Sequence, residues 1–148
     1  MSSPQKIKGT KFERDIAEWL TENVTNSSWK RVPGSGAIGT IVGEPFLTGD
    51  INGIVNSIGK KFKVEAKVGY GGEKQFALKR EWLEKIREEA DAAYSIPMVA
   101  GKFSGSRGKV KTFIVLESQV FADLLNLITE KDLDIQRLQE EATHETLG

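Results

Sequence analysis

The chain has 148 residues, of which 39% are hydrophobic and 28% are charged, values typical of one globular domain with its own core. Cysteine is absent and the single histidine, His144, lies in a polar tail, which excludes disulfides and thiolate metal sites and disfavours histidine-based catalysis. No apolar run is long enough to cross a bilayer and the N-terminus lacks a signal-peptide core, so we expect a cytoplasmic protein without a membrane partner.

The net charge of zero hides an asymmetry along the chain. Residues 1–116 contain 19 Lys and Arg against 13 Asp and Glu, whereas residues 117–148 contain 2 against 8. A basic body with an acidic tail is typical of nucleic-acid binding, although solvated lysines alone give the same count. We therefore divide the chain into a body, 1–116, and an acidic C-terminal extension, 117–148.

The first predicted element is an amphipathic helix over residues 9–24, where apolar residues recur at helical spacing from Phe12 through Trp19 to Val24. Thr10 followed by Glu13 has the spacing of a capping box, which gives Glu13 a purely structural alternative role. The rest of this half is expected to form strands 29–32, 50–56 and 61–68, a Gly/Pro-rich loop at 33–49 and a turn at 57–60.

The second half is expected to hold a glycine loop, a charged helix, two strands and two C-terminal helices: 69–75, 78–93, 96–103, 110–116, 117–128 and 131–143. The buried stripe of the charged helix is predicted to be Leu78, Trp82, Leu83 and Ile86. The apolar residues of 117–128 must pack against the body or another subunit, and the acidic extension could also shield the basic body. The element order indicates an α/β fold, a mixed central sheet flanked by helices.

Residues 61–68, KFKVEAKV, alternate apolar and charged side chains, so Glu65 and Lys67 share one face of the predicted strand. One interpretation is the solvated face of a half-buried sheet, with a weak ion pair between them. The other is an active site. Asp50 begins the preceding strand, and two neighbouring antiparallel strands can bring it beside Glu65.

Two adjacent carboxylates repel each other unless a proton or a cation lies between them. An oxygen-only site without histidine or cysteine suits a hard cation, Mg²⁺ with Mn²⁺ as a plausible substitute. Lys67 would then point toward a metal-bound water or a phosphate. This combination is the apparatus of metal-assisted phosphodiester hydrolysis.

The spacing of Asp50, Glu65 and Lys67 resembles the PD-(D/E)xK nuclease superfamily, with Gly49 where that motif has proline. Together with KGTKFER, RVPGSG, GDI, VEAK and IPMVAGKF in the same order, it resembles the archaeal-type Holliday junction resolvases from about Lys8 to Phe103. The resemblance implies a restriction-endonuclease-like core and a role in DNA recombination and repair. The stretch from Ser35 to Asp50 is longer than in compact members, and 117–148 lies beyond the resemblance.

Residue by residue, the resemblance implies metal ligation by the carboxylates of Glu13, Asp50 and Glu65 and by the carbonyl of Ala66, with Lys67 as the catalytic lysine. It also implies that Ser35 is important for cleavage and that Arg31 lies near the DNA backbone. For Ser35 the alternative is a residue that satisfies backbone groups in its loop.

Candidate DNA contacts are drawn from the basic residues around these motifs and from an aromatic residue in the glycine loop: Lys8, Arg14, Arg31, Tyr70, Lys74, Lys79 and Arg80. Their alternative is that of solvated surface charges. Trp19 and Trp82 occupy helical apolar positions and are predicted to belong to the core.

The residues predict a Mg²⁺-dependent endonuclease, and the resemblance implies one that resolves four-way DNA junctions by paired symmetric nicks. Cutting two strands symmetrically needs two sites related by a two-fold axis, so we expect a homodimer. The alternatives are another PD-(D/E)xK nuclease (end, flap or restriction-like) and a non-catalytic DNA-binding module. A nucleoid-associated or virus-encoded protein is compatible with either class.

Overall fold

The computed structural model describes residues 3–33, 50–105 and 107–147, so Ser35 and the predicted loop at 37–48 lie outside the described residues. Two compact units, Met1–Glu117 and Ser118–Gly148, are described separately. The first unit contains α1 (Pro4–Asn23), β1 (Ser27–Arg31), β2 (Ile51–Val55), β3 (Lys60–Val68), α3 (Arg80–Ala92), β4 (Ile96–Lys102) and β5 (Thr112–Val115). The second is the helix α4 (Ser118–Leu147).

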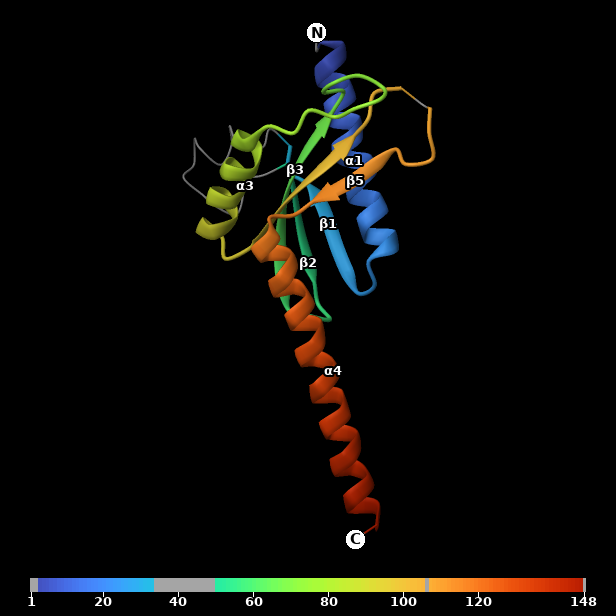
Figure 1. Ribbon diagram of the computed structural model, residues 1–148, viewed down its shortest axis with the longest axis vertical. Coiled ribbons are helices and arrows are strands. Elements are labelled where there is room, and N and C mark those ends of the chain that lie inside the picture. The colour runs from blue at the N-terminus through green and yellow to red at the C-terminus, as the bar shows by residue number, and fades with distance from the viewer. Residues whose placement is uncertain (1–2, 34–49, 106, 148) are drawn as a thin grey trace. The chain divides into compact units, whose positions relative to one another are not determined.

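The strands form one five-stranded sheet in the order β1-β2-β3-β4-β5, with β3 at its centre (Figure 1). Only the β3–β4 pair is parallel; the other three pairs are antiparallel. Helix α1 packs on β1 and β3, and α3 packs on β4 and β3 from the opposite face. The predicted mixed sheet flanked by helices is therefore confirmed.

Helix α1 begins earlier than the apolar spacing indicates. Pro4 occupies the first turn, where its missing N–H is harmless, and the Ser3 side chain accepts a hydrogen bond from the Lys6 N–H at 3.2 Å. The predicted start at Gly9, with Thr10 as the cap, is therefore wrong. The structural alternative for Glu13 as a capping residue is removed with it.

Strand β3 is covered on both faces. Phe62 packs against Trp29 with ring centroids 5.2 Å apart, and Lys63 and Glu65 on the other face are each only 2% exposed. A Cβ on Gly53 would lie 2.1 Å from the Trp29 ring, so glycine makes room for this side chain on β2. The solvated-face interpretation of the charged side of β3 is therefore wrong, because α3 covers it.

The core beneath α3 is formed by Trp82, Ile86 and Val99. Trp82 is thus a core residue as predicted, but Leu78 is 43% exposed because it precedes the first turn of the helix. Trp19 is 51% exposed, so its predicted core position is also wrong.

Helix α4 replaces the two predicted helices 117–128 and 131–143 with one of 30 residues. The sequence between them, Thr129–Glu130–Lys131, contains no glycine or proline to end a helix. Phe121, Leu125 and Ile128, which are predicted to pack against the body or another subunit, are exposed in the single chain. Within the described part of the chain, no helix is both long and apolar enough to span a membrane.

Candidate active site

A cleft of about 680 Å³ opens where α1, the end of β1, the start of β2 and the end of β3 meet. Its lining includes Glu13, Arg31, Asp50, Ala66 and Lys67. These residues come from four separated stretches of the sequence, so the packing of α1 on the sheet brings them together. Tyr70, just past the end of β3, lines the same cleft.

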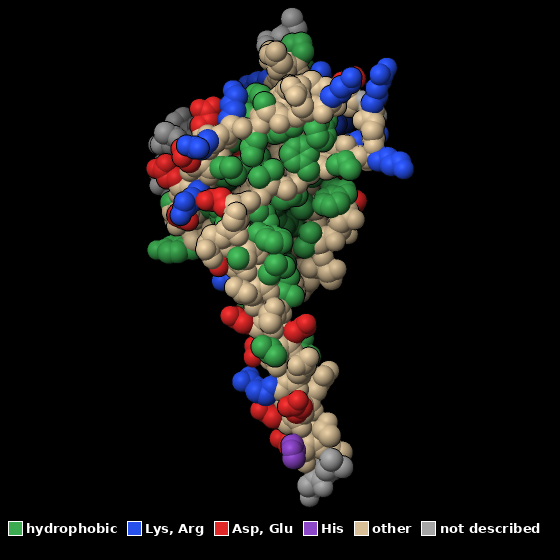
Figure 2. All heavy atoms as spheres, in the orientation of Figure 1, with side chains coloured by type: hydrophobic (Ala, Val, Ile, Leu, Met, Phe, Trp, Pro, Cys, Tyr) green, Lys and Arg blue, Asp and Glu red, His purple; other side chains and the backbone are tan. Residues whose placement is uncertain are grey.

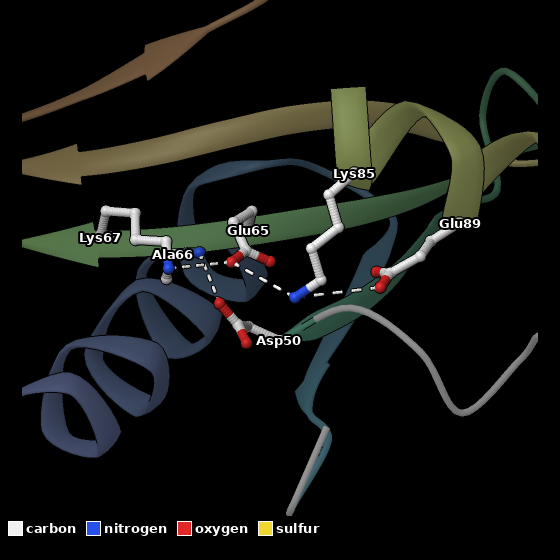
Figure 3. A network of polar contacts seen from close by, with 6 residues as sticks. All are labelled: Asp50, Glu65, Ala66, Lys67, Lys85 and Glu89. Atoms are coloured by element: carbon white, nitrogen blue, oxygen red, sulfur yellow. Dashed lines mark hydrogen bonds and ion pairs between the residues drawn. The ribbon is translucent and has the colours of Figure 1, made fainter. Parts of the chain in front are cut away.

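Asp50 is fixed by the backbone on both sides of it. Its N–H donates to the Val64 carbonyl at 3.0 Å, and its carbonyl accepts from the Val32 N–H at 2.9 Å. Its side-chain Oδ2 accepts a hydrogen bond from the Ala66 N–H at 2.8 Å (Figure 3). The Asp50 carboxylate is therefore held against β3 at the residue that follows Glu65, as the two-strand argument predicts.

Glu65 is buried beside the cleft residue Lys67, and two ammonium groups lie near one of its oxygens. Its Oε1 lies 3.1 Å from Lys67 Nζ and 3.9 Å from Lys85 Nζ (Figure 3). Its Oε2 is buried and has no hydrogen-bond partner among the described residues. A buried carboxylate oxygen normally accepts at least one hydrogen bond, so this atom has spare capacity to bind a cation.

The charges of the site perturb one another. Burial raises the pKa of Glu65 above its ordinary value and the neighbouring Asp50 raises it further, while Lys85 and Lys67 act in the opposite direction. Burial alone would lower the pKa of Lys67, but the Glu65 carboxylate outweighs it and raises that pKa. Lys67 therefore remains an ammonium, and the two lysines only partly offset the burial and the Asp50 charge that disfavour the charged form of Glu65.

Glu13 projects from α1 into the same cleft. Its Oε2 accepts a hydrogen bond from Arg31 Nε at 2.7 Å, which pins both side chains at the wall of the cleft. Burial and the nearby Asp50 raise the pKa of Glu13, and Arg31 opposes them. The structure thus places Glu13 and Arg31 at the site, while metal ligation by Glu13 stays a prediction.

Not all candidate DNA contacts reach this cleft. Lys8 lines an adjoining cleft of about 420 Å³, whereas Arg14 lines a depression between α1 and β1. Lys79 places Nζ 5.4 Å from the centroid of Tyr70, which is 36% exposed. Lys74 and Arg80 are exposed near the glycine loop but line none of the clefts described here.

Two charged residues of the site were missed in the sequence. Lys85 lies on α3 three residues after the buried Trp82, a spacing that puts both on one helix face and could have revealed it. Lys63 shares the face of Glu65 on β3 and donates to Asn52 Oδ1 at 3.0 Å. The alternation pattern assigned Lys63 to this face, but nothing in it indicated burial.

A divalent cation fits the chemistry of these donors. Within residues 3–33, 50–105 and 107–147, no three His, Cys, Asp or Glu side chains form a ready metal cluster. Mg²⁺ nevertheless needs only one or two protein carboxylates, since water and phosphate oxygens complete its coordination. Asp50 and Glu65, with the uncompensated Oε2, meet that requirement.

The comparisons with known proteins agree with this chemistry. A family model described as "Phage putative PDDEXK endonuclease" matches residues 4–147. The chain belongs to this family. PD-(D/E)xK nucleases generally use divalent metal ions, which accords with the carboxylate pair of this member.

A structure of Hjc, a Holliday junction resolvase from the archaeal hyperthermophile Archaeoglobus fulgidus, is similar to the chain with 20% identity and a TM-score of 0.47. The similarity covers 78% of this chain and 88% of that one. No curated protein matches the chain.

Proposed function

We propose that this family member is a metal-dependent endonuclease that hydrolyses DNA phosphodiesters at the cleft between α1 and β3. The observation that carries the proposal is the convergence of Asp50, Glu65 and Lys67 from neighbouring strands, with Glu65 Oε2 buried and without a hydrogen-bond partner. A binding module needs no such acidic cluster facing an anionic ligand.

Asp50 and Glu65, with the Ala66 carbonyl, would hold the divalent ion, Mg²⁺ or Mn²⁺. When bound, such an ion makes water more acidic and neutralises charge on the scissile phosphate. In the reaction a water oxygen forms a bond to phosphorus and the bond from phosphorus to the 3′ oxygen breaks. The leaving oxygen takes up a proton, so the products are a 5′-phosphate and a 3′-hydroxyl.

Lys67 is suited to stabilise the charge that develops on the phosphate. Its ammonium lies at the lining of the cleft and is oriented from behind by Glu65 Oε1 at 3.1 Å. Its Nζ also lies 5.2 Å from the centre of the Trp82 ring, whose face favours a cation. Two fixed contacts limit the positions of this donor before substrate arrives, which favours electrostatic catalysis.

The surface around the site suits a phosphate backbone. The main cleft adds Lys6 and Arg31, and the adjoining cleft adds Lys8, Lys11 and Lys102. The two clefts share three lining residues, Gln5, Val68 and Gly69, so they form a continuous path. Such a path recognises charge and shape rather than base sequence.

We further propose that the substrate is a four-way junction and that the enzyme works as a homodimer. The substrate is supported by the resolvase-like motifs, which follow one another along the sequence in the same order as in that family. The homodimer is supported because paired nicks require two symmetric sites. Figure 2 shows hydrophobic side chains gathered on the face of the body around β5. On the edge strand β5, Phe113 contacts Phe76 and Phe103, while the neighbouring Ile114 points to the other face and is exposed, so β5 is a candidate dimer surface.

A second candidate is a restriction-like, end or flap nuclease, which the same carboxylates and lysine would serve equally well. The family match to phage endonucleases favours keeping it, and it also accords with a virus-encoded protein. Cleavage of linear duplex as readily as of a junction would select this candidate.

The deciding experiment incubates the protein with synthetic junction, linear duplex and single-stranded DNA, with Mg²⁺ or with chelator. Asp50→Asn and Lys67→Ala should abolish cutting and leave junction binding largely intact, while Asp91→Asn and Lys30→Ala, at exposed positions elsewhere, should cut normally. Normal cutting by both site variants would refute the assignment. A solution mass showing only monomer at working concentration would count against junction resolution.

A further inference from the structure

Lys85 is a charged neighbour of Glu65 to which the proposed chemistry assigns no role. It projects from α3 toward Glu65 Oε1, 3.9 Å away, and lies 4.0 Å from Glu89 Oε1 one turn further along the same helix (Figure 3). Its side chain is 54% exposed, whereas that of Glu65 is almost completely buried. Lys85 is therefore the member of the pair that can move.

Two lysine ammonium groups lie near Glu65, and they differ in how firmly they are held. Lys67 is closer, is mostly buried and is also held over the Trp82 ring, so its position is fixed by the core. Lys85 has no comparable anchor among the described residues, and Glu89 Oε1 lies 4.0 Å from its Nζ, nearly as close as Glu65 Oε1. Two acceptors at equal distance allow its ammonium to shift between them with little change in its own energy.

A divalent ion held by Asp50 and Glu65 would carry the same sign of charge as Lys85 and be attracted to the same carboxylate. The ion and the ammonium then repel each other across a few ångströms. Either Lys85 turns toward Glu89 or the ion binds less tightly. In both cases the charge of Lys85 opposes metal binding.

We propose that Lys85 is a positioning residue that acts as an exchangeable counter-ion of Glu65, compensating its charge in the metal-free protein and yielding to the divalent ion. The inference rests on the proposed metal site of Asp50 and Glu65. It assigns Lys85 a task distinct from that of Lys67: it sets the metal affinity, while Lys67 faces the phosphate.

The size of the effect follows from the separation of the charges. Two unit charges about 4 Å apart in a water-like dielectric change an equilibrium constant roughly five-fold. Exposure of Lys85 to solvent screens this value, while the double charge of the ion enlarges it. Removal of the Lys85 charge should therefore tighten Mn²⁺ binding about three- to ten-fold.

The test measures the Mn²⁺ affinity of the 148-residue chain without DNA, from the electron paramagnetic resonance signal of free Mn²⁺. Lys85→Gln should bind Mn²⁺ about three- to ten-fold more tightly than wild type, and Lys85→Arg, which keeps the charge, should bind like wild type. Arg87→Gln is the matched control, since it removes one positive charge from α3 at a residue that pairs with Glu117 at 3.5 Å, and it should leave the affinity unchanged.

A second readout is the rise of the melting temperature on adding Mn²⁺, which should be larger for Lys85→Gln than for wild type or Arg87→Gln. Equal Mn²⁺ affinities of Lys85→Gln and Arg87→Gln would overturn the role of Lys85 but leave the proposed metal site standing. So would a Lys85→Arg variant that binds Mn²⁺ more tightly than wild type. Wild-type binding that Asp50→Asn does not weaken would overturn the metal site and this inference together.

Discussion

Replacing Glu65 by glutamine should stabilise the metal-free protein. The substitution removes the poorly compensated charge of a buried carboxylate, which costs about 1–3 kcal/mol, although the amide still leaves one polar atom without a partner. It also removes the partner of Lys67 and Lys85, a loss of about 1 kcal/mol for groups that remain partly exposed. The net gain is about 1 kcal/mol, which raises the melting temperature of a chain of this size by about 2–4 °C.

A bound divalent ion should make wild type more stable than Glu65→Gln. Mn²⁺ at a hundred times its dissociation constant stabilises a protein by about 2.7 kcal/mol, so wild type should gain roughly 5–10 °C. Glu65→Gln has lost one of two proposed carboxylate ligands and should gain little. The glutamine variant is thus expected to melt above wild type in chelator and below it in Mn²⁺.

Thermal unfolding followed by circular dichroism near neutral pH, with chelator and with Mn²⁺, measures both effects. Glu117→Gln is the control, because it removes a carboxylate of the first compact unit that pairs with Arg87 at 3.5 Å and does not line the cleft. It should respond to Mn²⁺ as wild type does. A Glu65→Gln variant that is less stable than wild type in chelator would refute the claim that burial leaves Glu65 poorly compensated.

Three further predictions concern the same region. The raised pKa of Glu65 means that the folded chain holds its proton more tightly than the unfolded chain, so this group's contribution to stability grows as pH falls toward 4.5. The advantage of Glu65→Gln in chelator should therefore shrink on acidification; a widening gap in urea titrations would contradict this. Arg31→Ala should lower the free energy of unfolding by about 1–3 kcal/mol, because it leaves the half-buried Glu13 carboxylate without its ion-pair partner. Adding Glu13→Gln should recover part of that loss, and urea unfolding measures both changes. Gly53→Ala should destabilise by about 1–3 kcal/mol because its Cβ meets the Trp29 ring, and a melting temperature equal to wild type would exclude this packing.

The strands and the carboxylate pair could be predicted because they follow from local alternation. The alternating run places Glu65 and Lys67 on one face wherever the strand lies, and the short connection from Asp50 favours antiparallel pairing with β3. Burial of that face depends on where α3 packs, which no local pattern contains. The alternation pattern therefore does not predict that Lys63 is almost fully buried.

The errors at the helices have similar causes. Trp19 shares the helical spacing of Ile16 and Leu20 but lies at the border of the buried stripe, where packing rather than period decides exposure. The Ser3–Pro4 start of α1 was overlooked because the apolar pattern begins later than the helix. Lys85 was missed because its spacing from Trp82 indicates the inner face of the helix but not the distant carboxylate that it meets there.

The position of β3 at the centre of the sheet has a consequence for how the site responds to damage. A central strand with hydrogen-bonded neighbours on both edges exchanges its amide hydrogens mainly through global opening, whereas edge strands and helix ends open locally. The segment that contains Glu65, Ala66 and Lys67 is therefore expected to be among the last to unfold. Weakening substitutions at the periphery should reduce the amount of folded protein without altering the turnover of the molecules that remain folded.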